Sequence, residues 1–306
     1  MATLKQMTER QERLTPGHRL CAGCGAPIVV RQILRATEHP VVIANATGCL
    51  EVSTSVYPHS AWQMPWIHTA FENVAATLSG VEGAYQSLKR QGKLDEEIRF
   101  VAFAGDGGTY DIGFQALSGA MERGHHMVYV CYDNGAYMNT GIQRSSATPY
   151  GADTTTTPVG RVIPGKTMHR KDMTAIMAAH NIPYVAQVSP SHWRDLDKKA
   201  AKAFEAGGAA FINALAPCWR GWRSRSEESI ELCRLAVDTC YWPLFEVEDG
   251  EWRLTYQPKE KLPVQEFLKG QGRFRHLLRP ENKERLEILQ KEVDRNWERL
   301  LKRTGA

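Results

Sequence analysis

Short apolar runs alternate with amphipathic segments along the first 240 residues of the chain. Runs with the length and composition of buried strands lie at 41–44, 99–104, 127–132, 184–188 and 210–215. Helical spacing of apolar residues is found between them, at 69–91, 110–123, 172–180 and 192–206. Strands that are apolar on both faces and are separated by helices are typical of a parallel sheet covered on both sides. The pattern therefore predicts a doubly wound α/β domain with a mostly parallel sheet.

Two stretches depart from this alternation. Residues 134–167 are rich in Thr, Gly, Pro and Ser, and we expect a connector of this length to belong to a site. After Trp242 the alternation of strands and helices is lost, and 281–303 has the spacing of one amphipathic helix. We therefore place an α/β domain at 1–245 and a C-terminal helical arm at 246–306. We expect the helix to pack on its own domain, with a subunit contact as the alternative.

The composition is that of an ordinary globular protein of 306 residues, with 42% hydrophobic and 24% charged residues. The 38 Lys and Arg against 34 Asp and Glu leave a charge of only +4, which gives no support to a nucleic-acid partner. The sequence has neither a signal-peptide core nor an apolar run of about 18 residues, so we expect a cytoplasmic protein without a membrane span. The aromatic and basic run 219–225 is interpreted as a solvated or subunit-facing loop.

The first chemical motif directly follows the predicted strand 99–104. Glycines at Gly105, Gly107 and Gly108 surround Asp106, at the place where α/β proteins bind phosphate groups between a strand and the next helix. The next strand is followed by Asn134. Because neighbouring parallel strands end at one edge of the sheet, Asp106 and Asn134 should lie close together there. Their oxygen atoms suit Mg²⁺, with a backbone carbonyl, diphosphate oxygens and water as the remaining ligands.

This arrangement resembles the thiamine diphosphate signature. The signature commonly ends in two Asn, and here Asp133 stands in place of the first, which leaves the second metal ligand in position. A tight turn alone would also explain the Gly-Asp-Gly string. The correctly spaced Asn134 favours cofactor binding over that simpler interpretation.

A second constellation consists of cysteines in separate loops. Cys21 and Cys24 form a Cys-x-x-Cys pair, and single cysteines follow at Cys49 and Cys218. Four thiolates can hold either Zn²⁺ or an iron–sulfur cluster. A zinc ribbon normally repeats the pair and a redox pair normally follows a strand, so both fit poorly. Beside an organic cofactor that creates electron-rich carbon, an electron-accepting cluster is the better interpretation. The other cysteines are expected only to pack: Cys131, Cys233 and Cys240.

Together these strings resemble the beta subunits of 2-oxoacid:ferredoxin oxidoreductases, most closely those that act on pyruvate. The resemblance spans about residues 18–245 and is carried by 21–27, 105–113, 131–141, 143–149 and 216–218. It implies a sheet of the thiamine diphosphate-binding type. It also implies a [4Fe-4S] cluster on Cys21, Cys24, Cys49 and Cys218, and Mg²⁺ on Asp106, on the Asn134 side chain and on the carbonyl of Ala136.

The resemblance further implies the residues around the organic cofactor. Asn139 corresponds to an amide that faces the substrate and the reactive carbon, and it is the expected catalytic residue. Ala26 falls where some relatives carry Glu. The expected cofactor-binding residues are Ala26, Cys49, Gly105, Asp106, Gly107, Gly108, Asn134, Gly135, Ala136, Tyr137, Met138 and Asn139.

No motif supplies the Glu that thiamine chemistry requires. The family places it, with an Arg for the substrate carboxylate, on an alpha subunit, and it implies gamma and ferredoxin-like delta subunits as further partners. The expected reaction is the reversible oxidative decarboxylation of a small 2-oxo acid, pyruvate first, with coenzyme A and ferredoxin. Three alternatives stay open: another 2-oxo acid such as oxalate, a non-redox decarboxylase with structural zinc, and a non-catalytic scaffold subunit.

Overall fold

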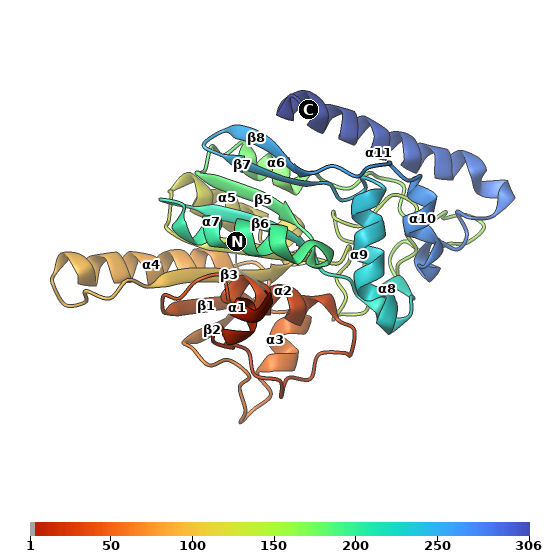
Figure 1. The fold of residues 1–306 in the computed structure, drawn as a ribbon. Coiled ribbons are helices and arrows are strands. Elements are labelled where there is room, and N and C mark those ends of the chain that lie inside the picture. Colours follow the sequence, from red (N-terminus) through yellow and green to blue (C-terminus); the bar gives the residue numbers. More distant parts are fainter. Residues whose placement is uncertain (1–3) are drawn as a thin grey trace.

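The computed structural model describes residues 4–306, and within them one sheet of eight strands forms the centre of the molecule (Figure 1). The strands are β1 (Val41–Ala46), β2 (Trp66–Thr69), β3 (Arg99–Gly105), β4 (Val128–Asp133), β5 (Tyr184–Val188), β6 (Ala210–Leu215), β7 (Leu244–Glu248) and β8 (Glu251–Tyr256). Their order is β2-β1-β3-β4-β6-β5-β7-β8. The first six strands in this spatial order are parallel to one another. The last two, β7 and β8, are added antiparallel at the end of the sheet. The predicted doubly wound, mostly parallel sheet is confirmed.

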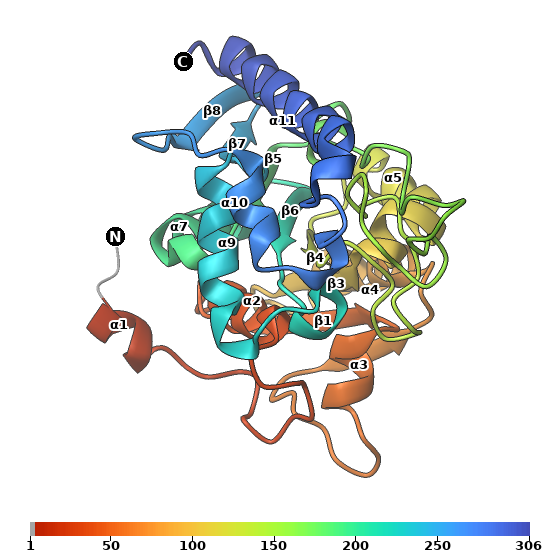
Figure 2. The same cartoon turned by 90° about the vertical axis from the view of Figure 1, so that its right-hand side faces the viewer.

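Helices cover both faces of this sheet (Figures 1 and 2). The helices are α1 (Leu4–Glu9), α2 (Gly25–Leu34), α3 (Cys49–Thr54), α4 (Val74–Arg90), α5 (Phe114–Glu122), α6 (Met173–Ala178), α7 (Trp193–Glu205), α8 (Trp219–Trp222), α9 (Ser229–Asp238), α10 (Val264–Lys269) and α11 (Lys283–Thr304). A π-helical turn, η1 (Gly108–Ile112), precedes α5. Short 3-10 turns lie at Pro190–His192, Ser226–Glu228, Gly272–Phe274 and Pro280–Asn282. No helix of the described chain is long and apolar enough to cross a membrane.

Successive side chains of a strand point to opposite faces of the sheet, so the apolar core is divided into two clusters, one on each face. In β3, Val101 and Phe103 pack with α2 and α7, whereas Phe100 and Ala102 pack with α4 and α5 on the opposite side. Both clusters are almost fully buried, which explains why β3 and β4 have continuous apolar sequences. The carboxyl ends of these central strands are thereby held at a fixed edge, where the candidate site lies.

Strands and helices no longer alternate after Trp242, as expected, but this part of the chain is not purely helical, because β7 and β8 form a hairpin on the sheet. Their turn, Asp249-Gly250, has positive φ at both residues, which is the conformation that an Asp-Gly hairpin favours. Side chains of β8 alternate between exposed and half-buried, so its apolar content is too low for a buried-strand pattern. β7 also crosses residue 245, where we place the end of the α/β domain; that division stays a prediction.

The C-terminal helix α11 packs on its own chain, beside β8 and α10 (Figure 2). Its buried stripe contains Leu289, Val293, Trp297 and Leu300. Burial of an aliphatic side chain of this size contributes about 1.5–3 kcal/mol, so the stripe is enough to hold the helix in place. The expected packing on its own domain is present.

A candidate cofactor cleft beside four thiols

Polar oxygens converge where β3 and β4 end. Gly105 pairs with Tyr132 in the parallel register, so the residues that follow each strand, Asp106 and Asn134, meet at the sheet edge. The amide oxygen of Asn134 lies 3.0 Å from Oδ1 of Asp106 and 2.8 Å from the carbonyl oxygen of Ala136. Three acceptor atoms thus face one another without a donor between them. A reversed amide or a cation would satisfy this arrangement.

The Asp106 carboxylate is the buried member of this group, with 1% of its surface exposed. Burial raises its pKa well above the ordinary value, and the negative charge of Asp133 adds to that shift. Ser145, from the long loop 134–167, donates its hydroxyl to Oδ2 of Asp106 at 2.5 Å. The backbone N–H of Asn134 donates weakly to Oδ1 at 3.4 Å. A buried carboxylate without a cationic side chain is the type of group that a metal ion stabilises.

The spacing of these oxygens suits magnesium, and a reversed Asn134 amide would span the same two distances as hydrogen bonds. Octahedral Mg²⁺ holds oxygen atoms at 2.0–2.1 Å, which puts adjacent ligands about 2.9 Å apart. The two separations found among the oxygens of Asn134, Asp106 and Ala136 are 2.8 and 3.0 Å. The donor set, a carboxylate with an amide and a carbonyl oxygen, is also the kind that Mg²⁺ prefers. These residues fit the ion.

A cleft of about 330 Å³ opens beside these oxygens. Ten of the twelve residues expected to bind the cofactor line it, all except Gly135 and Ala26: Cys49, Gly105, Asp106, Gly107, Gly108, Asn134, Ala136, Tyr137, Met138 and Asn139. Asn139 is exposed at this cleft. Ala26 does not line it, because its methyl group is buried in the core with Val29 and Val30.

Gly107 has no side chain, so the ring of Tyr137 can approach its backbone closely. A Cβ atom there would lie 2.2 Å from the ring of Tyr137, whose hydroxyl donates to the Gly107 carbonyl at 2.9 Å. Partial burial raises the pKa of Tyr137 to about 12, so the phenol stays protonated at neutral pH. The glycine-rich turn and the 134–139 segment are therefore packed together as two walls of one cleft.

Sequence reasoning missed five residues of the lining: Thr47, Gly48, Phe71, Tyr132 and Thr140. Thr47 and Gly48 directly follow β1, which neighbours β3 in the sheet. Their position after a third parallel strand was the signal that could have found them. The hydroxyl of Tyr132 is buried and has no hydrogen-bond partner within the described chain, and Gly48 is next to it.

The four predicted cluster cysteines come from separate elements and interact. Cys24 precedes α2, Cys49 begins α3 and Cys218 precedes α8. Burial raises the pKa of Cys24 to about 12, and the nearby thiols of Cys218, Cys49 and Cys21 add to the rise. Burial likewise raises the pKa of Cys49 to about 12, with contributions from Cys218 and Cys21. Within residues 4–306 no three His, Cys, Asp or Glu side chains are arranged to hold a single metal ion.

Backbone contacts hold the cysteine loops against each other. The N–H of Gly25 donates to the Pro217 carbonyl at 2.9 Å, and a Cβ on Gly25 would lie 2.2 Å from the Pro217 ring. The N–H of Gly221 donates to Sγ of Cys218 at 3.4 Å. Hydrogen bonds of this kind to sulfur are a feature of protein sites for iron–sulfur clusters. Glycine at position 25 is therefore needed for the approach of Cys24 to Cys218.

The cleft lies next to the four-cysteine group. Cys49 belongs to both, since it lines the cleft and its thiol interacts with that of Cys218. Met138, also in the lining, packs against the turn that contains Gly221. The remaining cysteines are buried elsewhere in the core: Cys131, Cys233 and Cys240.

Three comparisons place the chain among known proteins. Residues 46–214 match the family described as "Thiamine pyrophosphate enzyme, C-terminal TPP binding domain". The chain is 53% identical to the pyruvate synthase subunit PorB of Thermotoga maritima, over 97% of this chain and 95% of that protein. It is 55% identical to PorB of Methanocaldococcus jannaschii, over 93% and 95%, and 46% identical to the ketoisovalerate oxidoreductase subunit VorB of Pyrococcus furiosus, over 95% and 93%.

A solved structure shows the same fold at lower identity. It is described as a 2-oxoglutarate:ferredoxin oxidoreductase from Magnetococcus marinus with 2-oxoglutarate, coenzyme A and succinyl-CoA bound. The TM-score is 0.57 at 19% identity, with 74% of this chain and 80% of that chain covered. The sequence matches and the shared fold agree with the geometry of the cleft. The chain belongs to the beta-subunit family of thiamine diphosphate-dependent 2-oxoacid:ferredoxin oxidoreductases, the family of the pyruvate synthase subunits PorB.

Proposed function

We propose that this chain is the beta subunit of a pyruvate synthase-type enzyme and holds thiamine diphosphate, Mg²⁺ and a [4Fe-4S] cluster. The enzyme would convert pyruvate and coenzyme A to acetyl-CoA and CO₂, reversibly, and pass the electrons to ferredoxin. The observation that carries the proposal is the convergence of three oxygens, from Asp106, Asn134 and Ala136, in a cleft that shares Cys49 with the four-thiol group. Bound thiamine diphosphate would supply the nucleophilic carbon and accept the electron pair that decarboxylation releases.

The chain's own residues would anchor and orient that cofactor. Asp106, Asn134 and the Ala136 carbonyl would hold the Mg²⁺ that bridges to the diphosphate. Gly107 and Gly108 have no side chains, so their turn packs directly against Tyr137 and Phe71, and the backbone of this turn would face the phosphate groups. Ser145 keeps the Asp106 carboxylate oriented through its hydrogen bond. Asn139, exposed at the cleft, would contact the substrate as the catalytic amide.

The four thiols would provide the exit for electrons. Cys21 and Cys24 share one loop, whereas Cys49 and Cys218 lie on two other segments. The four thiols affect one another electrostatically, as ligands around a shared centre would. Because Cys49 also lines the cleft, a cluster held there would lie next to the cofactor. A short path between the two centres is what one-electron transfer requires.

A partner subunit is part of the proposal. Asp106 is the only acidic residue among the described residues that line the cleft, and the lining contains no Arg. The activating Glu and the substrate-binding Arg would therefore come from an alpha subunit, with gamma and ferredoxin-like delta subunits completing a cytoplasmic complex. Val52 and Ile112 are exposed on the segments that begin with Cys49 and Gly108, which agrees with a protein surface covered on assembly.

A second substrate class is supported by a specific comparison. The 46% identity to a ketoisovalerate oxidoreductase subunit is close to the value for some pyruvate synthase subunits, such as 45% for Pyrococcus furiosus PorB. Sequence similarity of the beta subunit therefore does not identify which 2-oxo acid is the substrate. Branched-chain 2-oxo acids are the second candidate, and oxalate a third.

The test is purification of the co-expressed complex without oxygen, followed by extraction of its cofactors. We expect thiamine diphosphate and four iron atoms per beta chain, with visible absorbance near 400 nm. Zinc in place of iron would support the non-redox alternative, and absence of thiamine diphosphate would support the scaffold alternative. A panel of 2-oxo acids with viologen as electron acceptor then identifies the substrate.

A further inference from the structure

A buried ion pair lies directly behind the three converging oxygens. Asp133, the last residue of β4, precedes Asn134 and has 2% of its side chain exposed. Its Oδ2 accepts hydrogen bonds from the Tyr110 hydroxyl and from Nη2 of Arg170, both at 2.8 Å. Its Oδ1 accepts from the N–H of Gly135 at 3.0 Å. One carboxylate is thus bonded to a cation, to a phenol and to the turn that contains Asn134.

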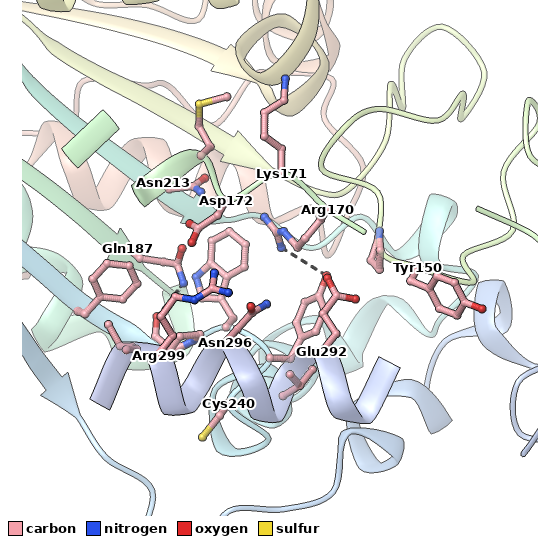
Figure 3. Close-up of a pocket in the computed structure, with 18 of the residues that line it drawn as sticks. Tyr150, Arg170, Lys171, Asp172, Gln187, Asn213, Cys240, Glu292, Asn296 and Arg299 are labelled. Carbon is pink, nitrogen blue, oxygen red and sulfur yellow. Dashed lines mark hydrogen bonds between the residues drawn. The ribbon is translucent and has the colours of Figure 1, made fainter. Parts of the chain in front are cut away.

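Arg170 is held in one orientation by its surroundings. Nη2 also donates to the Tyr110 hydroxyl at 2.9 Å, and Nη1 lies 3.4 Å from the hydroxyl of Tyr241. The guanidinium carbon is 4.8 Å from the centre of the Trp242 ring. Figure 3 shows Arg170 on the wall of a second cavity, of about 840 Å³, formed with α11. Arg170 therefore reaches Asp133 from this second cavity and does not line the cofactor cleft.

The pair connects both segments that contain the converging oxygens. Tyr110 belongs to η1, which follows Asp106 and begins at Gly108. Gly135, held by Asp133, lies between Asn134 and Ala136 and has a φ of +76°, so the turn depends on its hydrogen bonds for a defined shape. Through Asp133 and Tyr110, Arg170 is linked to the segments on both sides of the cleft.

We propose that Arg170 is a positioning residue for the metal-binding turn: it neutralises Asp133 and thereby holds Asn134 and Ala136 against Asp106. The inference rests on the proposed function, because it concerns the same Mg²⁺ site. It also explains the departure from the usual pair of Asn residues. A buried Asp at position 133 requires a counter-ion, whereas an Asn would not.

The effect of losing Arg170 depends on the negative charge of Asp133. Without the guanidinium, a buried carboxylate would remain one residue from Asn134 and close enough to Asp106 to raise the pKa of that group. Removing one partner of a buried ion pair is far more costly than removing both, because the remaining charge loses the cation that it contacts. Arg273 also interacts electrostatically with Asp133 but forms no ion pair with it within the described residues. Asp133 would turn away from its present position, and its hydrogen bond with the N–H of Gly135 would weaken.

The first test measures how much Mg²⁺ the assembled complex needs to retain thiamine diphosphate. Bound cofactor is quantified after gel filtration at graded Mg²⁺ concentrations, so the readout does not depend on activity. Changes to residues that orient metal ligands typically weaken metal binding about 10- to 100-fold, and we expect Arg170→Met to raise the Mg²⁺ requirement within this range. Arg170→Lys, which keeps the charge, should give a smaller increase.

The double variant separates positioning from general stability. Asp133→Asn combined with Arg170→Met removes both charges and restores the usual Asn-Asn pair, so its Mg²⁺ requirement should fall below that of Arg170→Met alone. If Arg170 had only a structural role, the effects of the two substitutions would add, and the double variant would need more Mg²⁺ than Arg170→Met alone. An unchanged requirement in Arg170→Met would also overturn the inference.

The second cavity allows a chemical rescue. Arg170→Ala leaves a space that opens into this cavity, so millimolar guanidinium can enter and face Asp133. We expect added guanidinium to lower the Mg²⁺ requirement of Arg170→Ala but not that of Asp133→Asn/Arg170→Ala. Arg299→Ala is the matched control, because Arg299 lines the same cavity and makes no hydrogen bond or ion pair within residues 4–306. It should behave like the wild type with and without guanidinium.

Failure of the inference and failure of the proposed function give different results. A wild-type complex that retains no thiamine diphosphate at any Mg²⁺ concentration contradicts the proposed function. A wild-type complex with Mg²⁺-dependent retention, together with Arg170 variants that neither differ from it nor respond to guanidinium, contradicts only the role of Arg170.

Discussion

Replacing Asp106 with Asn should have opposite effects on the empty and the loaded protein. Asp106→Asn keeps the size of the side chain and can still hydrogen bond with Ser145 and with the N–H of Asn134, which contact the carboxylate in the wild type. It removes a buried negative charge whose pKa is raised by burial and by Asp133. Without ligands, the variant should therefore be at least as stable as the wild type, because an uncompensated buried charge disfavours the fold.

The loss should appear when Mg²⁺ and thiamine diphosphate are added. A ligand present at 100 times its dissociation constant stabilises the folded state by about 2.7 kcal/mol. For a chain of this size such a gain raises the unfolding temperature by about 5 °C. The variant lacks the carboxylate that would face the metal, so we expect this ligand-induced rise to disappear at the same concentrations.

Thermal unfolding of the assembled complex, with and without the two ligands, measures both effects. Asp111→Asn is the matched control: Asp111 accepts hydrogen bonds from Ser146 on the same side of the sheet but is not among the converging oxygens. It should keep the ligand-induced rise. A full rise in Asp106→Asn would refute the metal assignment, and a large loss of stability in the ligand-free variant would refute the reasoning about buried charge.

Other predictions concern the thiols, one glycine contact and one buried amine. Cys49→Ser and Cys218→Ser should each lower iron content and visible absorbance, whereas Cys233→Ser should not; equal iron loss in all three would mean that a ligand is misassigned. Gly25→Ala should lower iron content without removing any thiol, because its methyl group would meet Pro217 at 2.2 Å; iron analysis checks this. Burial lowers the pKa of Lys166 to about 8 from 10.5, so the unfolded chain binds more protons between these values, and this residue's contribution to the free energy of unfolding should rise with pH there. Urea unfolding of the wild type and Lys166→Met across that range measures the difference in slope, and equal slopes would contradict the assignment.

The central strands could be predicted from sequence because they are buried on both faces. The predicted strands at 184–188 and 210–215 agree with the structure at both ends, and 99–104 differs from β3 by one residue. The edge strands β2 and β8 were missed, as was β7, which lies between β5 and β8. β8 has one half-buried face and one exposed face, so its apolar residues alternate and never form a run. The Asp249-Gly250 dipeptide before β8 is typical of a hairpin turn, but a search for apolar runs alone does not detect it.

The candidate site was predictable where spacing along the chain determines position in space. Asp106 and Asn134 follow adjacent parallel strands, so one strand–helix–strand step brings them to a common edge. Arg170 and Ser145 could not be found in this way, because they lie in or after a long connector whose path no periodic pattern describes. Ala26 is a different case: its place in a motif suggested a cofactor contact, whereas packing of α2 buries it in the core outside the cleft lining, and the contact stays a prediction.

The central claim is that this chain provides one half of a 2-oxo acid oxidoreductase site. Anaerobic viologen reduction with pyruvate, coenzyme A, Mg²⁺ and thiamine diphosphate tests it most directly, with the isolated chain compared with the complex co-expressed with its partner subunits. The account predicts rapid viologen reduction by the complex and none by the isolated chain, since correctly placed proton transfer is typically worth about 10²- to 10⁴-fold and we propose that the activating Glu lies on the partner. Full activity of the isolated chain, or a complex that is inactive with every 2-oxo acid, would contradict it.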